Sequence, residues 1–181
     1  MGNLCRKTGK IGRNHLNLPQ KSKMEPFTFK KITVEDVYVS VLEAKRIRNA
    51  EGWEKVLPVD KQPAPTGSLV MDAVARFLAV RRGATPSELA SWLQMDNGTL
   101  RRIFLYLTGL PSADFLAQYR LLQAKEWLAS TDLSLTEVGE RCGFTTLSAF
   151  SAWFIRWAKV APRDYRHRNR PANFRDWYRW K

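Results

Sequence analysis

Two adjacent arginines, Arg101 and Arg102, lie in a short segment whose apolar residues recur at helical spacing. The apolar face is formed by Leu100, Ile103, Phe104 and Leu107, which leaves both guanidinium groups pointing toward solvent or a partner. The planar guanidinium fork can donate two hydrogen bonds to one acceptor pair, such as O6 and N7 of guanine in the major groove of DNA. An arginine pair on a helix is an ordinary solvated surface as often as it is a DNA contact. Whether this pair binds DNA therefore depends on the elements around it.

The segment before the arginines predicts a helix-turn-helix. Thr85–Glu88 has the pattern of a capping box, with a proline at the first helical position, and predicts a short helix over residues 86–93. Residues 94–98 break the periodicity, and a second helix follows over residues 99–107, ended by Gly109. A short helix, a tight turn and a second helix are typical of DNA-reading units.

The same unit occurs again 50 residues later. Ser134–Glu137 repeats the capping box, and Leu100 and Phe104 recur as Phe150 and Phe154. Residues 112–130 between the copies predict one long helix, and residues 146–158 predict the second helix of the second copy. We therefore expect two helix-turn-helix units joined by a long helix.

The outward positions of the two units are the candidate DNA contacts. In the first unit these are Asn97, Thr99, Arg101 and Arg102, and in the second Thr145, Thr146, Ser148 and Ser151, with Arg156 and Arg166 as candidate phosphate contacts. The side chains of the second unit are small and neutral, so they can make single or phosphate hydrogen bonds but no bidentate contact to a base. A helix cap with a solvated face is the alternative interpretation of that second set.

Several stretches resemble a known family. The order and spacing of LRRIF, TG, YRLLQAKEWLAST, LSLTEVGERCGF, AFSAWF and APRDYR resemble the double helix-turn-helix domain of AraC/XylS regulators over residues 68–168. The resemblance implies an all-α fold and a sequence-specific DNA-binding transcription regulator, most often an activator. It also implies that double-stranded DNA and RNA polymerase are the partners, that Arg102 occupies the position of the family's usual arginine, and that Arg101 occupies a usual contact position.

The chain departs from the family pattern at four positions. Members commonly have arginine where Ala152 stands and glycine where Lys159 stands, and basic residues where this chain has Leu105 and Tyr106. We therefore expect the second unit to hold the protein on the DNA through phosphate contacts rather than to recognise bases. A degenerate member that acts through protein–protein contacts, with another regulator or RNA polymerase, is the rival interpretation. A single-strand binder that uses the basic aromatic tail NFRDWYRWK is another, and that tail could instead be a packed end.

Charge and composition indicate a polyanion as partner. The net charge is +13, and the basic excess lies mainly in residues 1–66 and 163–181, where it would attract phosphates without regard to sequence. No run is apolar enough for a membrane span or a secretory signal, which predicts no membrane partner and a cytoplasmic, nucleoid-associated protein. Cysteines and histidines lack metal spacing, so no metal, cofactor or catalysis is expected.

The predicted domains are a basic, partly disordered segment and linker (1–66), the double helix-turn-helix domain (67–168) and the tail (169–181). The first segment is too short and too polar for a ligand-sensing barrel, so no small-molecule effector is expected. Residues 1–31 are expected to be poorly ordered. Residues 33–50 fit both a helix capped by Thr33 and an alternating strand, and the helix is favoured.

Overall fold

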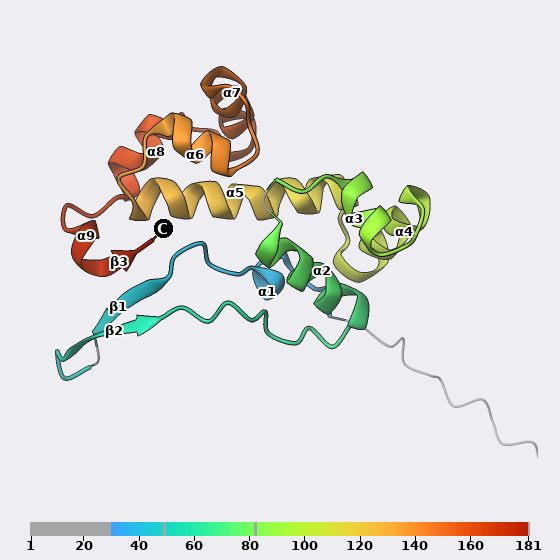
Figure 1. The fold of residues 1–181 in the computed structure, drawn as a ribbon, viewed down its shortest axis with the longest axis horizontal. Coiled ribbons are helices and arrows are strands. Elements are labelled where there is room, and N and C mark those ends of the chain that lie inside the picture. Colours follow the sequence, from blue (N-terminus) through green and yellow to red (C-terminus); the bar gives the residue numbers. More distant parts are fainter. Residues whose placement is uncertain (1–29, 49, 82, 181) are drawn as a thin grey trace, which may run out of the picture. The chain divides into compact units, whose positions relative to one another are not determined.

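A computed structural model describes residues 30–48, 50–81 and 83–180 (Figure 1). Lys31–Lys181 form one compact unit. The elements in chain order are α1 (Val34–Val37), β1 (Ala44–Arg48), β2 (Glu54–Pro58), α2 (Leu69–Val80), α3 (Pro86–Trp92), α4 (Asn97–Thr108), α5 (Ser112–Ser130), α6 (Leu135–Arg141), α7 (Leu147–Ala158), α8 (Pro162–Asn169), α9 (Phe174–Trp177) and β3 (Tyr178–Arg179). The predicted disorder falls on residues 1–31, most of which lie outside the described residues.

The long helix α5 has the predicted bounds and serves two hydrophobic cores. Phe115 and Tyr119 in its first half are buried in one core, and Trp127 and Leu128 in its second half are buried in the other. Figure 1 shows α3 and α4 beside its N-terminal end and α6 to α8 along its C-terminal half. One helix therefore carries the helix pair α3–α4 at one end and the helix pair α6–α7 at the other, an arrangement consistent with the two predicted helix-turn-helix units.

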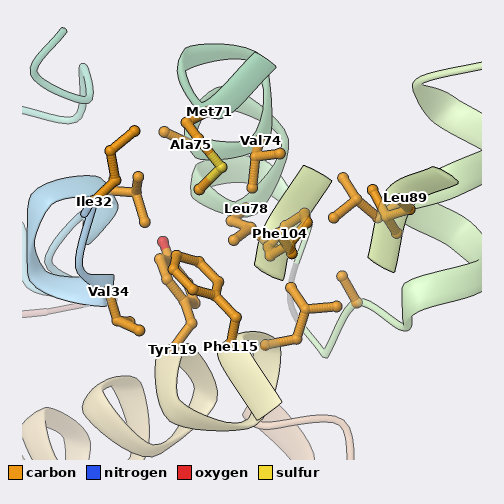
Figure 2. Close-up of a cluster of buried hydrophobic side chains, with 14 of the residues drawn as sticks. Ile32, Val34, Met71, Val74, Ala75, Leu78, Leu89, Phe104, Phe115 and Tyr119 are labelled. Carbon is orange, nitrogen blue, oxygen red and sulfur yellow. The ribbon is translucent and has the colours of Figure 1, made fainter. Parts of the chain in front are cut away.

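The first core joins α1, α2, α3 and α4 to α5. Met71, Val74 and Leu78 of α2 face the aromatic rings of Phe104 and Phe115 (Figure 2). Those two rings meet edge to face with their centroids 5.2 Å apart, a favourable geometry for aromatic pairs. Because Phe104 is fully buried, the outward face of α4 is fixed by this packing.

The second core repeats the arrangement with more aromatic residues. Phe150 and Phe154 of α7 are fully buried, as their predicted equivalence to Leu100 and Phe104 requires. A Cβ added to Gly139 of α6 would lie 3.1 Å from the Cβ of Phe150, so α6 and α7 approach closely there. Cys142 is buried and unbridged, as expected of a small apolar residue.

A three-stranded sheet corrects the all-α prediction. Its strand order is β2-β1-β3; β1 pairs antiparallel with β2 from Ala44↔Pro58 to Arg48↔Glu54, and with β3 at its start. The predicted cap at Thr33 is present, and Asp36 completes it as a capping box, but the helix that it starts ends at Val37. The strands were missed because their sequences, AKRIR and EKVLP, carry charges rather than alternating apolar residues, and because pairing with distant residues forms the sheet.

Glu126 of α5 fastens the segment before the sheet to the long helix. Its carboxylate accepts hydrogen bonds from the hydroxyl of Tyr38 (2.7 Å), the hydroxyl of Ser40 (2.7 Å) and the backbone amide of Val41 (2.9 Å), and pairs with Lys45 (2.7 Å). Burial opposes ionisation, but the hydrogen bonds from Lys45, Tyr38 and Ser40 outweigh it and lower the pKa of Glu126. The segment is therefore held by a charged group as well as by packing.

The C-terminal tail is packed rather than free. Phe174 is buried and stacks on Trp180 with ring centroids 5.9 Å apart, and Arg175 forms an ion pair with Asp132 at 3.0 Å. These contacts favour the packed-end interpretation of the tail over a free stacking platform. No helix in the described part of the chain is both long and apolar enough to cross a membrane.

Candidate nucleic-acid interface

The first unit presents Arg101 and Arg102 on the exposed face of α4. Both side chains are exposed, whereas Leu100 and Phe104 on the opposite face are fully buried. The start of the helix is capped by Asp96, whose carboxylate accepts a hydrogen bond from the amide of Thr99 at 2.9 Å. The cap and the buried residues therefore fix which face of α4 carries the two guanidinium groups. The sequence predicts the buried residues, but it does not predict Asp96 as the cap.

A chain of hydrogen bonds orients Arg102. Its Nη2 donates to the hydroxyl of Thr99 at 3.0 Å, and that hydroxyl donates to Asp96 at 2.6 Å. The hydroxyl and amide of Thr99 hold the pKa of the Asp96 carboxyl below its ordinary value, so the acceptor stays ionised. Thr99, itself a predicted DNA contact, therefore also supports Arg102 from within the protein.

Asn97 stands at the junction between the two helices of the first unit. It is exposed, and its side-chain amide donates to the hydroxyl of Ser87 on α3 at 3.5 Å, a long and weak bond. The side chain is therefore still available to a partner. Asn97, Arg101 and Arg102 are all exposed in the first half of α4.

The second unit presents a smaller and uncharged surface at the matching place. Thr146 is the cap of α7 and accepts a hydrogen bond from the amide of Ala149 at 3.2 Å. Thr145, Ser148 and Ala152 are exposed, and Ser151 is half-buried. Arg156 is exposed in the last turn of α7, where a guanidinium group can reach a phosphate.

Arg166, a predicted phosphate contact, has a hydrogen-bond partner within the protein. It is half-buried in α8, and its Nη2 donates to the backbone carbonyl of Leu133 at 2.6 Å. Burial, and then the positive charge of Arg170, lower the pKa of Arg166. This hydrogen bond links α8 to the loop between α5 and α6.

Arg120 is a positioning residue that the sequence analysis missed. It projects from the middle of α5, and its Nη2 donates to the carbonyl of Gly83 at 2.9 Å. Its guanidinium also lies over the ring of Phe144, 5.5 Å from the centroid. The sequence feature that could have identified Arg120 is a single charged residue between two apolar ones, Tyr119 and Leu121, both of which are buried.

This geometry agrees with the comparisons to known proteins. Residues 89–168 match a family model described as a helix-turn-helix domain. The DNA-binding domain of AdpA, a global transcriptional factor solved in complex with a target DNA, is 32% identical with a TM-score of 0.50, and the match covers 55% of this chain and 90% of that domain. The chain carries a DNA-binding domain of the AraC/XylS family.

Curated relatives of this AraC-type domain are transcriptional activators by name. The activator RhaR of Yersinia pseudotuberculosis serotype O:1b is 37% identical over 75 residues, which cover 41% of this chain and 26% of that protein. RhaR of Enterobacter sp. (strain 638) is 30% identical over 134 residues, covering 73% of this chain and 45% of that protein. The matched regions thus span less than half of the relatives' own length.

Proposed function

We propose that the protein regulates transcription by binding a specific promoter sequence through two adjacent major grooves, with α4 as the reading helix and α7 mainly as an anchor. The observation that carries the proposal is the inequality of two otherwise matching helices. Arg101 and Arg102 are exposed on α4, whereas the corresponding face of α7 carries Ser151 and Ala152. Only the first pair has a fork that can discriminate guanine.

The contacts inside α4 support Arg102 as the principal base-reading residue. Its hydrogen bond to Thr99 restricts the side chain before DNA arrives, so less conformational entropy is lost when it binds a base. Arg101 and Asn97 lie on the same exposed face and would contact neighbouring bases or phosphates. On α7, Arg156 would contact a phosphate, while Ser148 and the two threonines directly before the helix, Thr145 and Thr146, would fix the register along the DNA backbone.

The experiment that tests this function is selection of bound duplexes from a random library, followed by affinity measurements at one fixed salt concentration. The selected duplex, a scrambled duplex and the selected single strand are compared. A sequence-specific regulator should bind the selected duplex at least ~10³-fold more tightly than the scrambled one. Equal affinity for both duplexes contradicts sequence-specific binding, and tighter binding of the single strand contradicts a duplex reader.

A second candidate function rests on the apolar surface of α4. Leu105 is 40% exposed and Tyr106 is 69% exposed, at positions where family members commonly carry basic residues. Large exposed apolar side chains are typical of protein-binding surfaces. Activation would then depend on a contact with RNA polymerase or another regulator.

The two candidate functions can be distinguished by measuring transcription from a template that carries the selected site upstream of a core promoter. Leu105→Ser with Tyr106→Ser should retain affinity for the selected duplex but lose activation if this surface binds the polymerase. Loss of duplex affinity itself would instead place both side chains in the DNA interface.

A further inference from the structure

The two helix-turn-helix units touch each other through a pair of glycines. Gly83 lies between α2 and α3, directly before the first unit, and Gly143 lies between α6 and α7 of the second. A Cβ added to either glycine would lie 3.0 Å from the Cα of the other. Both residues also have positive φ values, +66° and +86°, which other residues adopt only with strain. The closeness of the two turns therefore depends on the absence of side chains.

Arg120 ties the same two turns together from α5. Its Nη2 donates to the carbonyls of Gly83 at 2.9 Å and Ala84 at 3.3 Å, which lie directly before the first unit. Its guanidinium lies 5.5 Å from the ring centroid of Phe144, which belongs to the second unit. A cation over an aromatic ring is attracted more strongly where water is partly excluded, as it is around this half-buried side chain.

The aromatic ring that Arg120 contacts packs on α7, the proposed anchoring helix. Phe144 packs against Trp153 and Phe150 of α7, with ring centroids 5.0 Å and 5.7 Å apart. On the other side, Ala84 comes directly before the cap of α3, Thr85. One side chain thus connects the start of the first unit to the recognition helix of the second, at the border between the two cores.

We propose that Arg120 and the Gly83–Gly143 contact act as a latch that fixes the separation of α4 and α7, and thereby the spacing of the two half-sites that the protein accepts. This inference rests on the proposed function, in which both helices enter major grooves. Each base pair inserted between half-sites moves them ~3.4 Å apart and rotates them by roughly 35°. With the latch in place, α4 and α7 cannot adjust their separation to such a change. Without the latch, each helix can move together with its own core.

The latch is tested first without DNA, by measuring the distance between spin labels on α4 and α7. Leu105→Cys and Ile155→Cys place the labels at matching exposed positions, in a Cys5→Ser background that leaves only the buried Cys142. Arg120→Met removes the hydrogen bonds and the charge while keeping an unbranched apolar stem. The parent should give one narrow distance distribution, and Arg120→Met a clearly broader one.

Arg170→Met is the matched control. Arg170 donates to the carbonyl of Thr131 at 3.2 Å and lies over the ring of Phe174 at 4.7 Å, so it makes the same two kinds of contact within the second half of the chain alone. Its distance distribution should equal that of the parent. If Arg120→Met does not fold, Gly143→Ala acts on the other part of the latch and should lengthen or broaden the same distance.

The consequence for DNA is tested with selected duplexes that have one base pair added or removed between the half-sites. The parent and Arg170→Met should lose on the order of 10-fold in affinity, the scale of one lost base contact. Arg120→Met should lose roughly threefold or less, because its units can adjust. A folded Arg120→Met with the parent's distance distribution overturns the latch. If the distance distribution of Arg120→Met broadens but the parent binds no duplex specifically, the proposed function is overturned instead.

Discussion

Lys159 ends α7 with the left-handed backbone that Gly109 provides at the end of α4, 50 residues earlier. The φ values are +59° at Lys159 and +79° at Gly109, and each backbone amide donates to the carbonyl four residues before it. The equivalence extends the internal repeat to the helix ends. It also shows that the departure from glycine at Lys159 is accommodated without a change in backbone, at an energetic cost.

Lys159→Gly is therefore expected to stabilise the protein by about 0.5 to 1 kcal/mol, because a Cβ in the left-handed region costs roughly that much once the greater freedom of unfolded glycine is deducted. The measurement is the free energy of unfolding in urea. Gly109→Lys is the reciprocal control and should destabilise. A neutral or negative effect of Lys159→Gly would mean that the lysine side chain makes a compensating contribution.

The two capping boxes should contribute to stability and not to DNA affinity. The hydroxyl of Thr85 accepts a hydrogen bond from the amide of Glu88 at 3.2 Å, and that of Ser134 from the amide of Glu137 at 3.1 Å. Replacing either residue by alanine leaves a helix amide without its cap and should cost ~0.5 to 2 kcal/mol. Thermal melts test this, and a variant with unchanged melting but abolished binding would place that hydroxyl at the DNA.

Glu126→Gln should weaken the attachment of residues 38–45 to α5 and lower the free energy of unfolding by about 2 to 3 kcal/mol at neutral pH, since charged hydrogen bonds are lost in a largely buried site. Glu140→Gln, at an exposed position of α6, is the control. Urea titrations of both variants and the parent measure the difference.

The contribution of Glu126 should also depend on pH in one direction. Because its folded pKa is below the ordinary value of 4.5, its stabilisation is fully present above about pH 4.5 and is lost as the pH falls through the lower, folded pKa. The gap between the parent and Glu126→Gln should therefore close on acidification. A gap that widens at low pH would show that the carboxyl is stabilised in its protonated form.

The helices α3 to α7 could be predicted because their signals are local. The capping boxes at Thr85 and Ser134, the stop at Gly109 and the uninterrupted pattern of residues 112–130 each depend on neighbours a few positions away. The 50-residue repeat then predicted that Phe150 and Phe154 occupy the places of Leu100 and Phe104, as the burial of all four confirms.

The remaining features depend on partners far away in the sequence. Residues 44–48 form a strand because they pair with residues 54–58 and 178–179, and only the turn glycine, Gly52, was a local sign of a hairpin. Arg166 resembles a surface arginine in the sequence, yet it binds a carbonyl 33 positions away. Residue type identifies what a guanidinium group can bind, but only the fold decides which carbonyl or phosphate is within reach.

The basic segment at the start of the chain should supply salt-dependent affinity without selectivity. Residues 1–31 contain eight lysines and arginines and one acidic residue, and each phosphate neutralised adds ~0.9 to the slope of log affinity against log salt. Deleting residues 1–30 should flatten that slope and leave the preference for the selected duplex unchanged. A loss of preference at matched occupancy would mean that the segment reads sequence.

The inequality of α4 and α7 is tested most directly by the base preferences of two single variants, Arg102→Ala and Ser148→Ala, each measured against all single-base changes of the selected duplex. Arg102→Ala should erase discrimination of ~1 to 3 kcal/mol at one or two base pairs in one half-site. Ser148→Ala should weaken binding to every duplex by a similar factor. A Ser148→Ala variant that changes base preference as strongly as Arg102→Ala would contradict the assignment of α4 as the reading helix and α7 as the anchor.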